Sequence, residues 1–230
     1  MLAPEEWSAL LISLRVSIVS VLFMLVPGVA LAWLLARKRI PGKMLIDAVV
    51  HLPLVLPPVV VGYALLLLLG RSSFVGAWLH DSFGIELSFN WKGAAIAAGV
   101  MGFPLLVRSV RLAIELVDRR IEQAARTLGS GPLRVFLTIT LPLSLPGVLV
   151  GIVLAFARSL GEFGATIMFA GNIEGVTRTL PVAIFTHAQT PGGDPAALRL
   201  VAISVAISLA ALIVSEWLAR RISRRIGTAS

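Results

Sequence analysis

Arg158 and Glu162 are the ionisable residues that lie deepest in apolar sequence, four residues apart within a long hydrophobic run. If that run is helical, both side chains lie on one face, where a guanidinium and a carboxylate at this spacing can pair. Counted from Pro142, the pair lies about 24 Å along the helix. Charged groups at such depth usually pair with one another and face a bundle interior or a water-filled cavity. Two interpretations stay open: the pair lines or braces a polar pathway, or it is a structural ion pair near an interface.

The other residue types that carry chemistry do not form a catalytic or metal-binding set. The chain has no cysteine, which excludes disulfides, thiolate catalysis and iron–sulfur clusters. Its three histidines, His51, His80 and His187, lack the spacing of metal ligands. Ser159 has no histidine near it in the sequence and no two aspartates share a depth, so intramembrane hydrolysis is not supported. The phosphate-binding pattern Gly-x-x-x-x-Gly-Lys-Ser/Thr is also missing, so the chain is predicted not to be an enzyme.

The elements that position these residues are strongly hydrophobic. Of the 230 residues, 57% are hydrophobic and 14% are charged, and the mean hydropathy is +0.94. A soluble domain has about 45–50% apolar and about 25% charged residues, so lipid must be the solvent of this chain. The net charge of +8 does not indicate nucleic-acid binding, because the basic residues flank apolar runs and do not form a basic face.

Five apolar runs are long enough to cross about 30 Å of hydrocarbon. We predict spans over residues 9–36, 44–69, 91–112, 141–170 and 197–219. Residues 179–189 are apolar but form a short stretch, which favours a re-entrant or interfacial segment. The sequence therefore predicts an all-α integral membrane protein with about five transmembrane helices, in one domain over residues 1–230.

The placement of lysine and arginine predicts the orientation in the membrane. Most of the 20 basic residues lie between the first and second spans, between the third and fourth spans, or after the fifth. Under a five-span arrangement these segments share one side of the membrane, and basic loops face the cytoplasm. We therefore expect the N-terminus outside and the C-terminus in the cytoplasm.

One of these basic segments, residues 114–140, is more than a connector. Apolar side chains recur on one helical face at Ile121, Ala124, Ala125 and Leu128. Glu122 and Arg126 have the spacing of a helical ion pair. The run Gly129-Ser130-Gly131-Pro132 then ends this helix and starts another. The residues alone predict a short helix–turn–helix at the membrane surface, which is either a solvated amphipathic helix or a docking site for a partner.

The same segment resembles a loop of a known transporter family. Gln123-Ala124-Ala125, three residues, Gly129, nine residues and Ile139-Thr140-Leu141-Pro142 reproduce the spacing of the Glu-Ala-Ala loop of binding-protein-dependent ABC importer permeases. Gln123 stands where the family usually has glutamate, so a charge at this place would come from Glu122 or Arg126. The resemblance implies that this loop couples the chain to a cytoplasmic ATPase. The residues carried over to that interface are Asp118, Arg119, Glu122, Gln123, Ala124, Ala125, Arg126, Leu128, Gly129, Ser130, Gly131 and Pro132.

Two further segments, residues 51–63 and 157–166, look like the molybdate/sulfate branch of these permeases. The length favours the molybdate permeases, because sulfate permeases of the branch tend to carry an extra N-terminal span. The resemblance implies a type I importer permease fold and a homodimer in a bacterial inner membrane. It also implies two ATPase subunits, which bind ATP and Mg²⁺, and an external oxyanion-binding protein; the chain itself holds no cofactor or metal. Tungstate, sulfate or thiosulfate import and ion-coupled secondary transport stay as alternatives, and ATP dependence distinguishes the last of these.

An internal repeat marks two candidate hinges. Residues 52–62 align with residues 141–151 at a constant offset, and each copy has two prolines four residues apart. Such prolines can bend or break a helix, and matching interruptions point to a transport pathway, although prolines also commonly start helices. No arginine cluster or glycine-rich anion nest appears within the predicted spans, so we expect a weak, transient path for an anion. The candidate pathway and hinge residues are Pro53, Pro57, Pro58, Gly62, Pro142, Pro146, Gly147, Arg158 and Glu162.

Overall fold

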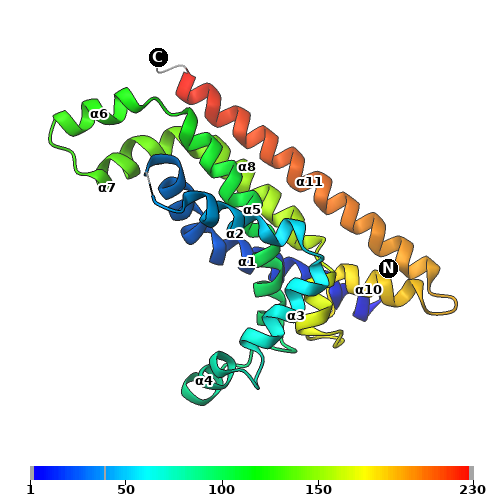
Figure 1. The fold of residues 1–230 in the computed structure, drawn as a ribbon. Coiled ribbons are helices and arrows are strands. Elements are labelled where there is room, and N and C mark those ends of the chain that lie inside the picture. The colour runs from blue at the N-terminus through cyan, green and yellow to red at the C-terminus, as the bar shows by residue number, and fades with distance from the viewer. Residues whose placement is uncertain (1–2, 39, 228–230) are drawn as a thin grey trace.

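A computed structural model describes residues 3–38 and 40–227, and over these residues the chain is helical without strands (Figure 1). The helices are α1 (Pro4–Arg37), α2 (Lys43–Val55), α3 (Pro58–Leu69), α4 (Phe74–Phe83), α5 (Trp91–Leu116), α6 (Arg119–Thr127), α7 (Pro132–Val135), a π-helix (Phe136–Thr140), α8 (Leu141–Leu160), α9 (Gly164–Ala170), α10 (Leu180–Ala188) and α11 (Asp194–Gly227).

Four helical segments of the described chain are long and apolar enough to cross a membrane: Pro4–Arg37, Trp91–Leu116, Pro132–Leu160 and Asp194–Leu218. Helices α2 and α3 make a fifth if they count as one broken span. The prediction of an all-α protein with about five spans is therefore confirmed. Helix α10 has nine residues, or about 14 Å, so it is too short to cross alone.

Two of the predicted continuous spans are broken. The second is split at Leu56–Pro57, where the axes of α2 and α3 differ by 114°. Proline disfavours a helical residue before it, and Pro58 then starts α3 at a position that needs no N–H. The fourth ends as α8 at Leu160, and a short break precedes α9.

Small residues fill the contact between α1, α5 and α8 at the centre of the bundle. Ser20 Oγ donates a hydrogen bond to Ser159 Oγ (3.1 Å), and Ser159 Oγ donates to the carbonyl of Ala98 (3.2 Å). Ala94 and Ala98 on α5 are completely buried. Lipid is as apolar as a leucine side chain, so close backbone packing and interhelical hydrogen bonds account for most of the association between such helices.

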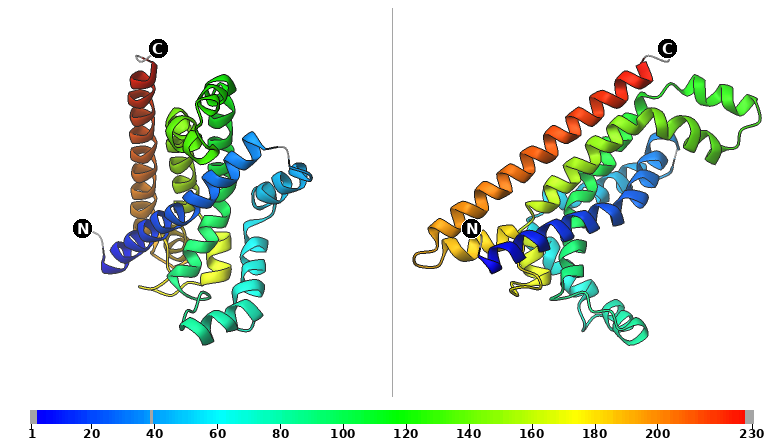
Figure 2. Two further views of the ribbon diagram at one scale, coloured as in Figure 1. Left: turned by 90° about the vertical axis from the view of Figure 1, so that its left-hand side faces the viewer. Right: turned by 180° about the vertical axis from the view of Figure 1, so that it is seen from behind.

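The basic connections gather at one end of the bundle. The C-terminal ends of α1 and α11, the start of α2, and helices α6 and α7 lie at this end, whereas the N-terminus and α10 lie at the other (Figures 1 and 2). At the N-terminal end of α5, the guanidinium of Arg15 lies 3.6 Å from the ring centre of Trp91. The three segments predicted for the cytoplasm thus share one side, and which side of the membrane they face stays a prediction.

Candidate functional site

The segment that the sequence singled out forms a short helix and a tight turn between α5 and α8. Asp118 caps α6 by accepting a hydrogen bond from the N–H of Arg120 (2.9 Å). After α6, Gly129 adopts a left-handed φ of 85°, which favours glycine, and Pro132 starts α7. The helix–turn–helix therefore lies where the sequence predicts it.

Glu122 holds α6 onto the rest of the bundle. Its side chain is only 7% exposed, and its Oε1 accepts hydrogen bonds from Arg37 Nε (3.0 Å) and Thr140 Oγ1 (2.6 Å). Arg37 also donates to the carbonyl of Val117 (2.8 Å). The carboxylate thus joins the end of α1 and the start of the α8 region to α6. The spacing of Glu122 and Arg126 suggested a local pair, but the partner of Glu122 is Arg37 instead, 85 positions earlier.

The apolar side of α6 is largely uncovered, with Ile121 at the edge of a groove against α5 and α8. Ile121 is 48% exposed and Leu128 is 87% exposed, and the side chains of Gln123 and Ala124 between them are exposed as well. The usual pattern of a surface helix is thus inverted, because a carboxylate lies inside and leucine and isoleucine lie outside. Exposed apolar patches of this kind mark contacts with another protein or with the membrane.

The second copy of the internal repeat contains no break. Helix α8 runs continuously through Pro146, so these two prolines do not break the helix, one of the two possibilities that the sequence left open. Pro142 lies in the first turn of α8, where a missing N–H is tolerated. In the π-helix before it, the N–H of Leu141 bonds to the carbonyl of Phe136, and this wider turn absorbs the irregularity.

An apolar groove of about 600 Å³ runs along this part of α8, between α5 and α6. Pro146 and Gly147 line it, and Ser109 Oγ donates a hydrogen bond to the carbonyl of Gly147 (2.9 Å). A side chain at Gly147 would overlap Ala113 on α5, so glycine is required for this close contact.

The first copy of the repeat packs against α9. A Cβ atom at Gly62 would lie 2.6 Å from the carbonyl oxygen of Ala165, and one at Gly164 would lie 2.8 Å from Cβ of Pro58. Helices α3 and α9 therefore meet backbone to backbone just after the break at Pro57. Pro53 lies within α2, one turn before that break.

Glu162 lies beside this contact, in the break between α8 and α9. Its Oε1 accepts a hydrogen bond from the N–H of Ala165 (2.8 Å), and its Oε2 lies 2.5 Å from Arg158 Nη1. This ion pair confirms that the two deep charges pair with each other. Glu162 is only 2% exposed. The structure brings Pro58, Gly62 and Glu162 together and places Pro142 and Pro146 at the opposite end of α8.

A polar groove lies between α2 and α5, and the sequence did not predict it. Arg108 and Arg111 lie on α5 near the end of the predicted third span, and the helix continues to Leu116, four residues beyond that end. They line a groove of about 330 Å³ together with Asp47, His51, Leu112 and Glu115. The signal in the sequence was the spacing of two arginines three residues apart at the end of an apolar run.

Comparison with known proteins shows which family has this arrangement of helices. Residues 28–226 match the family described as the inner membrane component of binding-protein-dependent transport systems. The chain belongs to this family. The resemblance to importer permeases and the location in an inner membrane are thereby confirmed.

Similar relatives of the chain are the molybdenum and sulfate permeases of this family. The chain is 60% identical to the molybdenum transport system permease protein ModB of Escherichia coli, over 98% of this chain and 99% of the relative. It is 53% identical to ModB of Haemophilus influenzae, over 96% and 97% of the two chains. The sulfate transport system permease protein CysT of Escherichia coli is 36% identical, over 97% of this chain and 80% of that longer protein.

Solved structures agree on the fold. A bacterial importer of the polysaccharide alginate matches with a TM-score of 0.75 at 17% identity, over 96% of this chain and 80% of that chain. The methionine ABC transporter MetNI in an inward-facing conformation matches with a TM-score of 0.71 at 15% identity, over 96% and 99%. The type I importer permease fold is thus shown for this family member.

Proposed function

We propose that this family member is the membrane subunit of an ATP-driven importer for molybdate. Two copies form one pathway at their interface, two ATPase subunits bind at the α6 end, and an oxyanion-binding protein docks at the other end. The identity of 60% to a molybdenum permease over nearly the whole of both chains supports molybdate over sulfate, for which the permease described above is 36% identical. This arrangement has the N-terminus outside and the C-terminus in the cytoplasm.

The inverted pattern of α6 is the observation that carries the coupling role. A buried carboxylate fixes the helix from inside while Leu128 and Ala124 face outward, which suits insertion into a cleft of another protein. Closure of the two ATPases on ATP then displaces α6, and the contacts of Glu122 transmit this displacement to α1 and α8. Hydrolysis takes place on the partner, because this chain has no phosphate-binding loop.

Uptake of labelled molybdate tests the substrate. Cells that lack the gene should lose uptake, and the gene should restore it. Excess tungstate should compete with molybdate in the restored cells, whereas excess sulfate should not. Loss of sulfate uptake in place of molybdate uptake would retain the permease function and reject the substrate.

A substitution on α6 tests the coupling. Ala124→Asp places a charge on the exposed apolar face, and we expect uptake and co-purification of the ATPase to fall about tenfold or more. Ala124→Ser adds a small polar group at the same place and serves as the matched control, with near-normal uptake. Membrane insertion of both variants is measured by fractionation. Normal uptake by Ala124→Asp would contradict the assignment of α6, and uptake that needs an ion gradient but no ATP would indicate a secondary transporter.

A further inference from the structure

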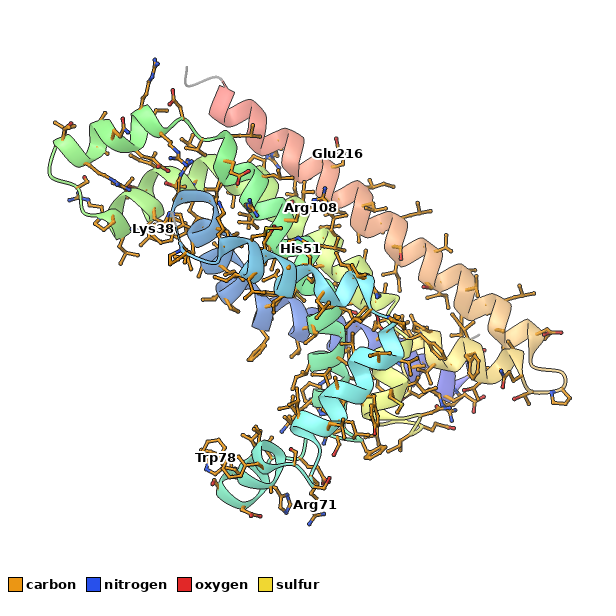
Figure 3. All side chains as sticks on the ribbon, in the orientation of Figure 1. Lys38, His51, Arg71, Trp78, Arg108 and Glu216 are labelled. Carbon is orange, nitrogen blue, oxygen red and sulfur yellow. The ribbon has the colours of Figure 1, made fainter. Side chains whose placement is uncertain are left out.

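Arg108 is a charged residue whose position the functions above do not explain. It lies in the groove between α2 and α5, and its side chain is exposed there. Figure 3 shows Arg108 and His51 on the same face of the protein, on neighbouring helices. None of the thirteen residues of α2 is buried within the chain, so this wall of the groove is thinly packed.

The carboxylates of the groove are already engaged by a different arginine. Arg111 Nη1 lies 2.7 Å from Asp47 Oδ1, and Arg111 Nε lies 2.9 Å from Glu115 Oε1. His51 Nδ1 lies 2.8 Å from the backbone carbonyl oxygen of Asp47 and 3.7 Å from its Oδ1. Within residues 3–38 and 40–227, no carboxylate lies within ion-pair distance of Arg108. The groove therefore has no net charge when His51 is neutral, but one of its two guanidinium groups lacks a counter-ion.

Arg108 lies near the edge of the hydrocarbon layer, at the basic end of α5, and its lack of a partner there is informative. It lies about 26 Å along α5 from Trp91, which is close to the thickness of the hydrocarbon layer. Arginine in a membrane-spanning helix usually pairs with an acid or faces a water-filled cavity that substrates or ions use. A guanidinium that has its N–H groups free in an open groove is suited to a planar or tetrahedral oxyanion, which it binds through two parallel hydrogen bonds.

We propose that Arg108 is a transient contact for the transported oxyanion in the cytoplasmic half of the pathway, with His51 and Arg111 as the other walls of the site. The inference rests on the proposed function, since it assigns the anion to the imported substrate. Asp47 and Glu115 neutralise Arg111 and keep the site from becoming strongly positive. Arg108, the guanidinium without a direct ion pair, contacts a dianion as it passes; because the groove has no net charge, the anion is released again, which fits a permease whose affinity lies in an external binding protein. The phosphate of an anionic lipid has the same chemistry, and the experiment separates the two sources.

The test compares variants of α5 in the complete importer. The chain is reconstituted in proteoliposomes with its ATPase and binding protein, and ATP-driven uptake of labelled molybdate is measured beside ATP hydrolysis. Arg108→Gln should lower uptake about tenfold, the effect of losing one charge-assisted contact, while hydrolysis stimulated by the binding protein stays within about twofold. Arg108→Lys should recover most of the uptake. Lys92→Gln removes an exposed cation at the other end of the same helix and should change neither quantity.

Each possible result either supports or overturns the role proposed for Arg108. Normal uptake by Arg108→Gln would overturn it, and so would an equal fall of uptake and hydrolysis, because that fall would assign Arg108 to coupling. An effect that occurs with phosphatidylglycerol in the membrane and disappears in pure phosphatidylcholine would assign Arg108 to a lipid headgroup and overturn the inference as well. An effect of the same size in both membranes supports it. Absence of molybdate uptake by the wild-type importer would instead refute the proposed function.

Discussion

Replacing Arg37 by alanine should release α6 from the bundle. Arg37 and Glu122 have side chains that are 6% and 7% exposed, so the pair is almost completely shielded from water. Removal of one partner from a buried ion pair typically costs about 3–5 kcal/mol, because the remaining charge is left uncompensated. Thr140 still donates its hydrogen bond to Glu122, so we take the lower end, about 3 kcal/mol. At about 1.4 kcal/mol per factor of ten, the undocked form of α6 increases about a hundredfold.

Trypsin cleavage of α6 measures this undocking directly. The helix contains Arg119, Arg120 and Arg126, and cleavage there requires that the helix unfold or move away. We expect Arg37→Ala to be cut much faster than wild type in membrane vesicles, and to hydrolyse more ATP for each molybdate ion imported. Lys38→Ala is the matched control, because it removes the neighbouring exposed cation, and it should behave as wild type.

A double variant separates charge from packing. Arg37→Met with Glu122→Met removes both charges and keeps apolar volume, so it should dock α6 better than either single change. If Arg37→Ala resists trypsin and imports molybdate as well as wild type does, the ion pair does not hold α6 and the reasoning above is refuted.

Two further predictions concern the contact between α3 and α9. Gly62→Val should reduce uptake and lower the free energy of unfolding by about 1–3 kcal/mol, because its Cβ would lie 2.6 Å from the carbonyl oxygen of Ala165; Gly161→Ala, whose nearest neighbour would lie at 3.6 Å, should show neither effect in thermal unfolding and uptake assays. Glu162→Gln should abolish most uptake because it leaves Arg158 unpaired. The double variant Arg158→Met/Glu162→Met distinguishes a pathway role of this pair from a structural one. A stable protein without uptake indicates a pathway role, whereas recovery of both stability and uptake indicates a structural ion pair.

The sequence predicted what depends on local pattern. The long apolar runs predicted α1, α5 and α11, and most of the predicted ends lie within a few residues of the observed ones. The glycines and the proline after Leu128 located the turn between α6 and α7. The family resemblance followed from the fixed spacing between Gln123 and Pro142. Each of these signals lies within one stretch of chain, so no knowledge of the packing was needed.

Features that depend on distant partners could not be predicted. Glu122 turns inward only because Arg37, at the end of α1, lies beside it, and in the sequence Arg37 is simply one of several basic residues after the first span. The two proline pairs look alike in the sequence, yet one breaks the chain and the other does not. The helix stays continuous at Pro142 because a π-helix precedes it. It breaks after Leu56 because two consecutive prolines follow. The groove around Arg108 could not be predicted because it forms between α5 and Asp47 and His51 of α2, which are distant in the sequence.

The exposed apolar face of α6 also bears on how the protein is produced. If this surface docks on an ATPase as proposed, a copy that has not met the ATPase presents Leu128, just after α6, and Leu133, in α7, to water, at 87% and 69% exposure. Chaperones and proteases that survey nascent chains bind such segments, so unassembled copies are open to removal. The surface that we propose couples the chain to an ATPase would then also keep the number of membrane subunits matched to the number of ATPase subunits.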